Sequence, residues 1–130
     1  MTRVLTYGTY DAFHWGHMLM LQRARAMGDW LGVGLSTDEF NAVKGKQSLL
    51  NYKERENILR GIKYIDLIFP ETCWEQKRED VIKYQADIFV ISDDWRGKFD
   101  YLSDLCKVIY IPRTPIISTS LIKHILKYER

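Results

Sequence analysis

The chain opens on the segment VLTYGTYDAFHWGH, residues 4–17, and this segment decides the fold. Residues 4–7 are β-prone and end at Gly8, whereas the stretch from Gly16 to Met27 is apolar on one face and stops at Gly28. A short strand followed by an amphipathic helix is the first half of a βαβ unit. The polar residues between them therefore fall at the end of a strand and the start of a helix.

The same alternation continues along the chain. Further strands are expected at residues 30–36, 64–69, 88–91 and 108–111, with Pro70 and Pro112 closing two of them. Further helices are expected from residue 37, at 52–62, at 75–84 and at 118–128. Apolar strands with long connections favour an α/β domain with a mostly parallel five-stranded sheet. Ligands bind at the carboxyl ends of such strands, so a functional motif should directly follow a strand.

Composition narrows the range of partners and compartments. The 130 residues fit one domain, residues 1–130, and the net charge of +2 lacks the basic excess of a nucleic-acid-binding protein. Cys73 and Cys106 form no CxxC pair and are expected to be free thiols in a reducing compartment. With no signal peptide and no long apolar run, we expect a cytoplasmic protein without membrane insertion.

His14 and His17 flank Trp15 and Gly16 at the expected start of the first helix. Amides at a helix start favour an anion, and a glycine lets a phosphate approach the backbone. The two imidazoles would donate hydrogen bonds to phosphate oxygens, more strongly if they are protonated. The alternatives are capping or core histidines, or a metal site, for which no nearby Cys or third His completes a ligand set.

A second motif, RTPIIST at residues 113–119, follows the last expected strand. Ser118 or Thr119 suits the N-cap of the final helix, and Arg113 offers a planar, bidentate phosphate donor beside it. Two helix starts after two strands would converge on one polyphosphate.

Three features are weaker alone. Lys44-Gly45-Lys46 lies in a polar loop and suits a clamp on phosphate, or is an ordinary solvated loop. Asp93 and Asp94 follow the strand at 88–91 and would hold a ribose hydroxyl, a base amino group or Mg²⁺, or simply form a turn. Arg55 is a further anion contact or a surface charge. No Walker A, G-x-G-x-x-G or nucleophile-elbow pattern is present, so the chemistry indicated is charge stabilisation on phosphates.

These residues resemble a known family. HWGH at residues 14–17 resembles the His-x-Gly-His signature of the nucleotidyltransferase superfamily, and RTPIIST resembles the R-T-x-G-I-S-T signature of its cytidylyltransferase branch. With STDEFN, WEQK, DDWRGKFD and IPRT, nearly the whole chain is similar to the bacterial glycerol-3-phosphate cytidylyltransferases. Ile116 and Ser92 stand where that family has glycine, and Lys63 stands where it has arginine.

The resemblance implies a Rossmann-like, three-layer α/β fold, a homodimer, and use of CTP with Mg²⁺. It implies transfer of CMP to glycerol 3-phosphate, giving CDP-glycerol for teichoic-acid or capsular polymers, with pyrophosphate as second product. Catalysis would fall to His14, His17, Lys44, Lys46 and Arg113. CTP would contact these two histidines and Arg113, together with Thr9, Tyr10, Asp11, Arg55, Asp94, Thr114, Ser118 and Thr119. The acceptor would contact Lys44, Lys46, Lys63 and Trp74. No metal site built from protein ligands is expected.

Other functions stay open at this point. Within the enzyme class the acceptor could be ethanolamine phosphate, choline phosphate or another polyol phosphate; ATP in place of CTP is disfavoured by the R-T-x-x-I-S-T form. Outside it, a nucleotide sensor would keep the pocket and lack turnover. A nucleic-acid role is disfavoured by the short chain and the balanced charge.

Overall fold

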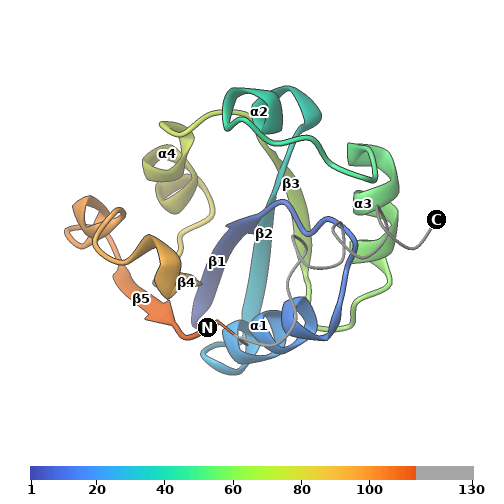
Figure 1. Cartoon of the computed structure of the whole chain (residues 1–130). Coiled ribbons are helices and arrows are strands. Elements are labelled where there is room, and N and C mark those ends of the chain that lie inside the picture. Colours follow the sequence, from blue (N-terminus) through green and yellow to red (C-terminus); the bar gives the residue numbers. More distant parts are fainter. Residues whose placement is uncertain (114–130) are drawn as a thin grey trace.

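The computed structural model describes residues 1–113, which form a five-stranded sheet in the order β3-β2-β1-β4-β5 (Figure 1). Every strand pairing is parallel, which confirms the predicted Rossmann-like α/β fold. The strands are β1 (Arg3–Gly8), β2 (Trp30–Ser36), β3 (Leu67–Glu71), β4 (Ile88–Ser92) and β5 (Lys107–Ile111). The helix predicted at 118–128, and with it Thr114, Ile116, Ser118 and Thr119, lies outside the described residues.

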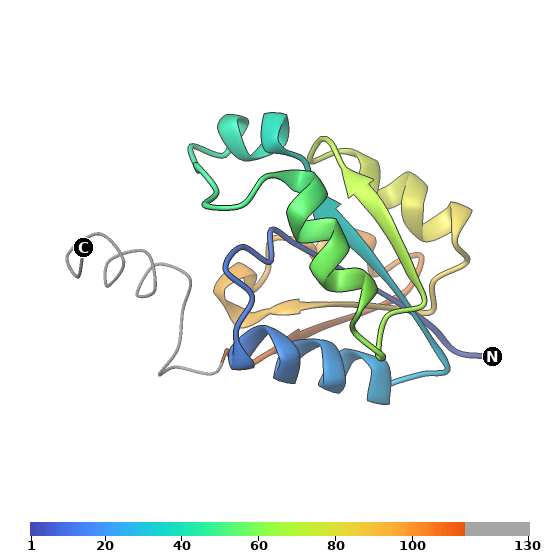
Figure 2. The ribbon, with the colours of Figure 1, turned by 90° about the vertical axis from the view of Figure 1, so that its right-hand side faces the viewer.

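Helices cover both faces of the sheet, so the described chain has three layers. They are α1 (Trp15–Ala26), α2 (Asp38–Val43), α3 (Tyr52–Arg60) and α4 (Gln76–Lys83), with short 3-10 turns η1 (Asp93–Trp95) and η2 (Asp100–Leu102). α1 and α3 lie on one face, and α4 lies on the other (Figure 2). The short α2 stands at one end of the sheet, above the strands in Figure 1.

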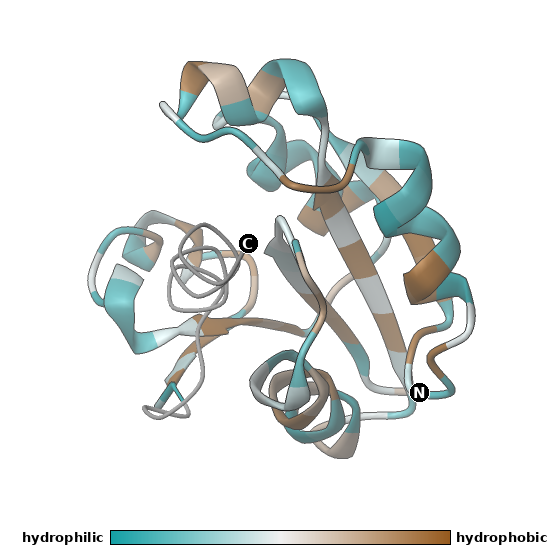
Figure 3. Ribbon diagram, turned by 45° about the vertical axis from the view of Figure 1, so that its right-hand side comes forward, coloured by the Kyte–Doolittle hydropathy of each residue, from teal (hydrophilic) through white to brown (hydrophobic). Residues whose placement is uncertain are grey.

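Alternation along β1 builds a separate hydrophobic core on each face. Val4 packs with Leu21 of α1 and Leu59 of α3, whereas Leu5 packs with Val81 of α4 on the opposite side. Successive strand residues point to opposite faces, so an apolar run such as this one serves both layers. Figure 3 shows hydrophobic residues along the strands, and helices that carry both hydrophobic and hydrophilic residues.

Polar side chains mark where three of the helices begin. His14 caps α1, the Thr37 side chain accepts from the Phe40 amide at the start of α2, and Asn51 forms a reciprocal capping box with Glu54 in α3. A side-chain acceptor at this position satisfies amides that have no partner within the helix. The cap at His14 matters most, because it lies at the carboxyl end of β1.

The strand predicted at 64–69, closed by Pro70, is placed wrongly. β3 instead runs through Pro70 to Glu71, and Pro70 pairs with Leu35 of β2. β3 is an edge strand of the described sheet, and an edge has one unpaired side on which a missing N–H breaks no ladder. The shift puts Glu71 at the carboxyl end of the strand.

The strand order reverses between β1 and β4. Connections from β1 lead to β2 on one side, whereas β4 lies on the other side of β1 and continues to β5. Such a switch point opens a crevice at the carboxyl ends of the two strands. The segments that follow β1 and β4, which hold His14 and Asp94, both start there.

Candidate active site

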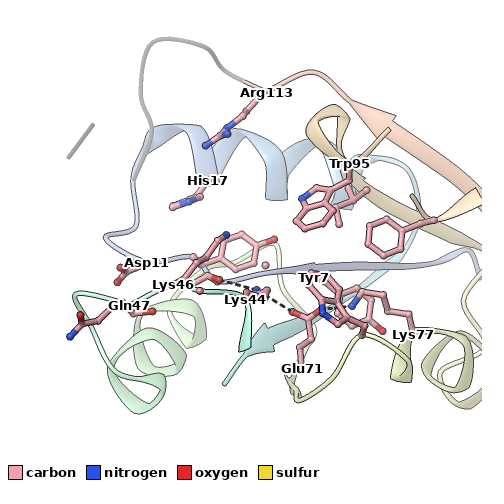
Figure 4. A pocket seen from close by; sticks show the side chains of 18 residues that line it. Tyr7, Asp11, His17, Lys44, Lys46, Gln47, Glu71, Lys77, Trp95 and Arg113 are labelled. Atoms are coloured by element: carbon pink, nitrogen blue, oxygen red, sulfur yellow. Dashed lines mark hydrogen bonds and ion pairs between the residues drawn. The ribbon is translucent and has the colours of Figure 1, made fainter. Parts of the chain in front are cut away.

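A cavity with two adjoining lobes lies at the carboxyl ends of the strands. The larger lobe has a volume of about 500 Å³ and the smaller about 190 Å³. His17, Lys46 and Arg113 line both lobes, so the two share a wall. Figure 4 shows His17 and Arg113 at one end of the large lobe, and Glu71 and Lys77 at the other.

His14 and His17 cap the helix with one ring nitrogen each. The Nδ1 atom of His14 accepts from the Gly16 amide at 3.0 Å, and the Nδ1 atom of His17 accepts from the His14 amide at 3.2 Å. The two rings stack with their centroids 3.8 Å apart. Because the Gly16 amide already has a partner, the anion contact expected at that amide passes to the histidine side chains.

Both histidines are neutral at physiological pH. Burial, followed by the nearby charges of His14 and Arg113, lowers the pKa of His17 to about 3. Burial and Arg113 also lower the pKa of His14. In a neutral imidazole whose Nδ1 accepts, the proton is on Nε2. The two imidazoles therefore offer neutral Nε2–H donors, as expected of unprotonated rings, and not the stronger donors of protonated rings.

The Nε2 atom of His14 is buried and has no hydrogen-bond partner among the described residues. A buried donor without a partner carries a free-energy cost of about 1–3 kcal/mol, which a ligand oxygen can remove. This atom belongs to a residue of the small lobe. An anion in that lobe is the ligand that a neutral N–H donor beside Arg113 favours.

Arg113 and Asp94 meet at the mouth of the small lobe. The guanidinium donates to the Asp94 carboxylate at 2.8 Å, and both side chains are about half exposed. The exposed pair contributes little stability, so a ligand phosphate can take over the guanidinium. Ser92, which stands where the resemblance implies a glycine, has φ −67°, a conformation that any residue adopts.

Gly45 sets the directions of Lys44 and Lys46. Two backbone hydrogen bonds close the end of α2. The Gly45 amide donates to the Ala42 carbonyl at 3.0 Å, and the Lys46 amide donates to the Asn41 carbonyl at 2.8 Å. This turn requires a residue with positive φ after the helix, and Gly45 has φ +75°. The predicted lysine loop is therefore a fixed turn with a lysine on either side of its glycine.

Lys44 reaches into the large lobe, whereas Lys46 is exposed at its rim. The Lys44 ammonium donates to Ser36 Oγ at 2.9 Å and to Thr9 Oγ1 at 3.4 Å, and it lies 4.0 Å from Glu71. Burial lowers the pKa of Lys44 to about 8, and the Glu71 carboxylate opposes that change. Lys44 is thus largely charged at neutral pH and loses its proton in the mildly alkaline range.

Sequence reasoning missed Glu71 and Lys77. Glu71 is 3% exposed and Lys77 only 1%, and they form a buried ion pair that lines the large lobe. Ser36 also donates to Glu71, at 2.5 Å. The available signal was an acidic residue at the carboxyl end of a strand, and the misplaced end of β3 concealed it.

Aromatic side chains wall the large lobe, and Trp74, the expected acceptor contact, is among them. Trp74 is 37% exposed and packs against Phe40 and Trp95, with ring centroids 5.0 and 5.6 Å away. Trp95 sits above the cavity in Figure 4, and it lines both lobes.

Arg55 lies behind the cavity, not in it. Its guanidinium is fully buried and donates to the carbonyls of Thr9, Ser36 and Leu50 at 2.8–3.1 Å. It also pairs with Asp38 at 2.8 Å. The direct nucleotide contact expected of Arg55 does not fit this position. Arg55 instead ties the segments after β1 and β2 to α3.

Asp11 and Thr9 also connect loops. The Asp11 carboxylate, 3% exposed, accepts from the amides of Leu49 and Leu50 at 2.7 and 3.0 Å. Thr9 donates to Asn41 at 3.0 Å. Both residues line the cavity, and their side chains also join the segment after β1 to α2 and to residues 49–50.

The backbone around Asp11 is strained. Tyr10 and Ala12 have φ angles of 51° and 47°, in the left-handed region that residues with a Cβ rarely adopt. Such strain persists where the surrounding structure over-determines the conformation, and it is concentrated at functional sites. Tyr10 is buried and packs edge-on against His17, so the strained turn supports the histidine pair.

The structure does not bring Lys63 to the cavity. Lys63 is exposed and precedes β3, at the amino end of the strand, whereas the cavity lies at the carboxyl ends. The acceptor contact expected of Lys63 is therefore not supported within this chain.

Within residues 1–113 no group of three or more His, Cys, Asp or Glu side chains is placed to hold a metal ion. Cys73 and Cys106 are free thiols, as predicted. None of the described helices is long and apolar enough to cross a membrane.

Comparison with known proteins assigns the family. The model of the cytidylyltransferase-like family matches residues 5–125, which is nearly the whole chain. The chain belongs to this family. The glycerol-3-phosphate cytidylyltransferase of Bacillus subtilis (strain 168) is 52% identical over 123 residues, covering 95% of both chains. The enzyme of the same name from Staphylococcus aureus is 54% identical over 123 residues, covering 95% of this chain and 93% of its own.

A solved structure supports the fold of this cytidylyltransferase-like chain. The lipopolysaccharide core biosynthesis protein of Thermoplasma volcanium aligns with a TM-score of 0.73 at 22% identity. The alignment covers 87% of this chain and 98% of the other.

Proposed function

We propose that this protein transfers CMP from CTP to glycerol 3-phosphate and releases pyrophosphate and CDP-glycerol. The observation that carries nucleotidyl transfer is the buried Nε2 of His14, which has no hydrogen-bond partner among residues 1–113 and lies beside His17 and Arg113 at the start of α1. The identity of 52–54% to two glycerol-3-phosphate cytidylyltransferases, over 95% and 93% of their lengths, supports the acceptor.

The small lobe is proposed to hold the phosphates of CTP. The Nε2–H groups of His14 and His17 donate to oxygens of the α-phosphate, and Arg113 leaves Asp94 to contact the triphosphate. Donors fixed before the reaction stabilise the charge that develops on the α-phosphate without reorganising during the step. Thr9 and Tyr10 line the same wall, and Asp94 is left to contact the nucleoside. Thr114, Ser118 and Thr119 are proposed to complete the triphosphate site.

The large lobe is proposed to hold the acceptor. Lys44 and Lys46 bind its phosphate, and Trp74 covers its alcohol end. The acceptor phosphate is a nucleophile without a general base, because the second pKa of such a group is about 6. One of its oxygens attacks the α-phosphorus of CTP in line. The bond to the bridging oxygen of the β-phosphate breaks, and pyrophosphate leaves with that bond's electrons.

We propose that Mg²⁺ arrives with CTP. Mg²⁺ keeps several waters and is bound largely through substrate phosphates, so it does not require a cluster of protein ligands, and residues 1–113 hold none. Bound there, the ion would neutralise charge on the β- and γ-phosphates.

We further propose, from the similarity to these two relatives, that residues 1–130 form one cytidylyltransferase domain. The domain works as a homodimer in the cytoplasm, without nucleic acid or membrane insertion. Its CDP-glycerol would feed a teichoic-acid-type or capsular polymer.

Pyrophosphate release from CTP across a panel of phosphorylated alcohols tests the proposal, with ATP as control nucleotide. We expect release with CTP and glycerol 3-phosphate, and CDP-glycerol as the product by phosphorus NMR. Release with a different alcohol would keep the mechanism and change the substrate. Binding of CTP with no release for any acceptor would refute the enzyme and favour a sensor.

The histidines have a sharper test. Replacing His14 or His17 by alanine should lower kcat by about 10²–10³-fold, the effect of removing one preorganised donor. Lys53→Ala is a matched control, because this side chain on α3 is 75% exposed and far from the chemistry proposed. Near-normal turnover of both histidine variants would refute their assignment.

A further inference from the structure

Lys77 occupies an aromatic box at the inner end of the large lobe. Its ammonium lies 4.7–5.9 Å from the centroids of four rings and is paired with the Glu71 carboxylate. The rings, which we call the aromatic box, belong to Tyr7, Phe40, Trp74 and Phe99. Three of them, with Glu71 and Lys77, line the cavity itself.

Aromatic rings around a carboxylate form a site that proteins use to bind alkylammonium ligands. Here the protein's own side chain fills that site. Lys77 is only 1% exposed, so its ammonium stays in the box instead of reaching solvent (Figure 4). The box is therefore closed to any second cation that enters through the lobe.

We propose that Lys77 is a resident cation that makes the large lobe accept phosphorylated polyols and reject phosphorylated amino alcohols. The proposal rests on the function proposed above and names the class of acceptor. The phosphate end is common to both classes. They differ at the other end, which carries neutral hydroxyls in a polyol and an ammonium in ethanolamine phosphate or choline phosphate.

The charges around the inner end of the lobe favour a neutral group. Lys44 and Lys77 share the single carboxylate of Glu71, so these three side chains carry a net charge of +1. A ligand ammonium would face two like charges and find the carboxylate already paired. Asp11, the other carboxylate lining the lobe among the described residues, accepts from the amides of Leu49 and Leu50.

Hydroxyl groups suit the same surroundings. A carboxylate has about four acceptor positions, so Glu71 can take a ligand O–H besides its contacts with Ser36 and Lys77. A polyol hydroxyl therefore bonds to the carboxylate without adding a charge to the lobe.

The test compares glycerol 3-phosphate with ethanolamine phosphate and choline phosphate for the full chain and for Lys77→Met. Methionine keeps the length of the side chain and packs well against aromatic rings. For the unmodified protein we expect kcat/KM to be at least about 100-fold higher with glycerol 3-phosphate, because like-charge contacts cost several kcal/mol. In Lys77→Met, Glu71 remains beside an open aromatic box, and the ratio should fall at least about tenfold.

Two variants separate charge from shape. Lys77→Arg keeps the cation and should keep the polyol preference. Glu71→Gln keeps Lys77 and removes the attraction for a ligand ammonium, so it should gain no use of amino alcohols. A ratio that is unchanged in Lys77→Met, or that falls equally in Lys77→Arg, would overturn the proposal. Absence of product with any acceptor in the unmodified protein would instead overturn the proposed function.

A measurement on the unmodified protein covers the case in which Lys77→Met does not fold. Ethanolamine phosphate is added as an inhibitor of CDP-glycerol formation. We expect an inhibition constant at least about 100-fold above the KM of glycerol 3-phosphate. An inhibition constant within tenfold of that KM would show that the lobe admits an ammonium, and would overturn the proposal.

Discussion

Replacing Arg55 by methionine should destabilise the fold by about 3–5 kcal/mol. The side chain is fully buried, and its loss leaves the carbonyls of Thr9, Ser36 and Leu50 without their donor. At about 1–2 kcal/mol for each buried unsatisfied acceptor, the three carbonyls account for most of this figure. Asp38 adds little, because its side chain is 45% exposed and can be solvated.

Urea unfolding followed by tryptophan fluorescence measures this loss. Lys53→Met on the same helix is the matched control, and its unfolding free energy should change by less than about 0.5 kcal/mol. Arg55→Lys keeps the charge, cannot reach all four acceptors, and should lie between the two. A loss below about 1 kcal/mol in Arg55→Met would refute the reasoning. If Arg55 contacted the nucleotide directly, Arg55→Lys would raise the KM for CTP at unchanged stability.

Three further predictions concern titration and backbone geometry. Folding lowers the pKa of His17 to about 3, so the free energy of unfolding falls as the pH drops below 6.5. Between pH 7 and 4.5 the unmodified protein should lose about 2 kcal/mol more of this free energy than His17→Asn does, as urea unfolding would measure. Since the pKa of Lys44 is about 8 in the free protein, kcat/KM should fall as pH rises through about 8, and Lys44→Arg should lack this alkaline decline; a shared decline would assign it to another group. Gly45→Ala should lower the free energy of unfolding by about 1 kcal/mol and should lower turnover, because Gly45 has φ +75°. Gly61→Ala, at φ −86°, should lower stability less. Thermal unfolding and the pyrophosphate assay would show both effects.

Much of the fold was predictable because strands and turns are local. The boundaries of β2 and the loop carrying Lys44 follow from apolar runs and from glycine, and the structure agrees with both. The end of β3 was not predictable, since Pro70 is tolerated only because β3 lies at an edge of the described sheet. Edge position is a property of the whole sheet, and no single segment encodes it.

The site was partly predictable for the same reason. The motif at His14 and His17 is contiguous, so its place between β1 and α1 could be inferred directly. Which basic side chains line the cavity and which lie behind it could not be inferred from the sequence. Arg55 and Lys77 are both basic residues on helices, and only the packing shows that one is saturated behind the cavity while the other lines it. The sequence gives the charge of each side chain, but its burial and its hydrogen-bond partners depend on how the helices pack on the sheet.

The double use of the histidine rings has a consequence for how the chain tolerates mutation. At position 14 a short side chain with an acceptor, such as asparagine, aspartate or serine, can cap the helix, and at position 17 glutamate or glutamine can accept from the N-cap amide. Abundance alone should therefore permit these replacements. Histidine alone combines that acceptor with a ring N–H on the opposite edge of a rigid ring. A library scored once for expression and once for turnover should therefore disagree most at these two positions, and agree at Leu21 or Val33, where burial is the sole demand.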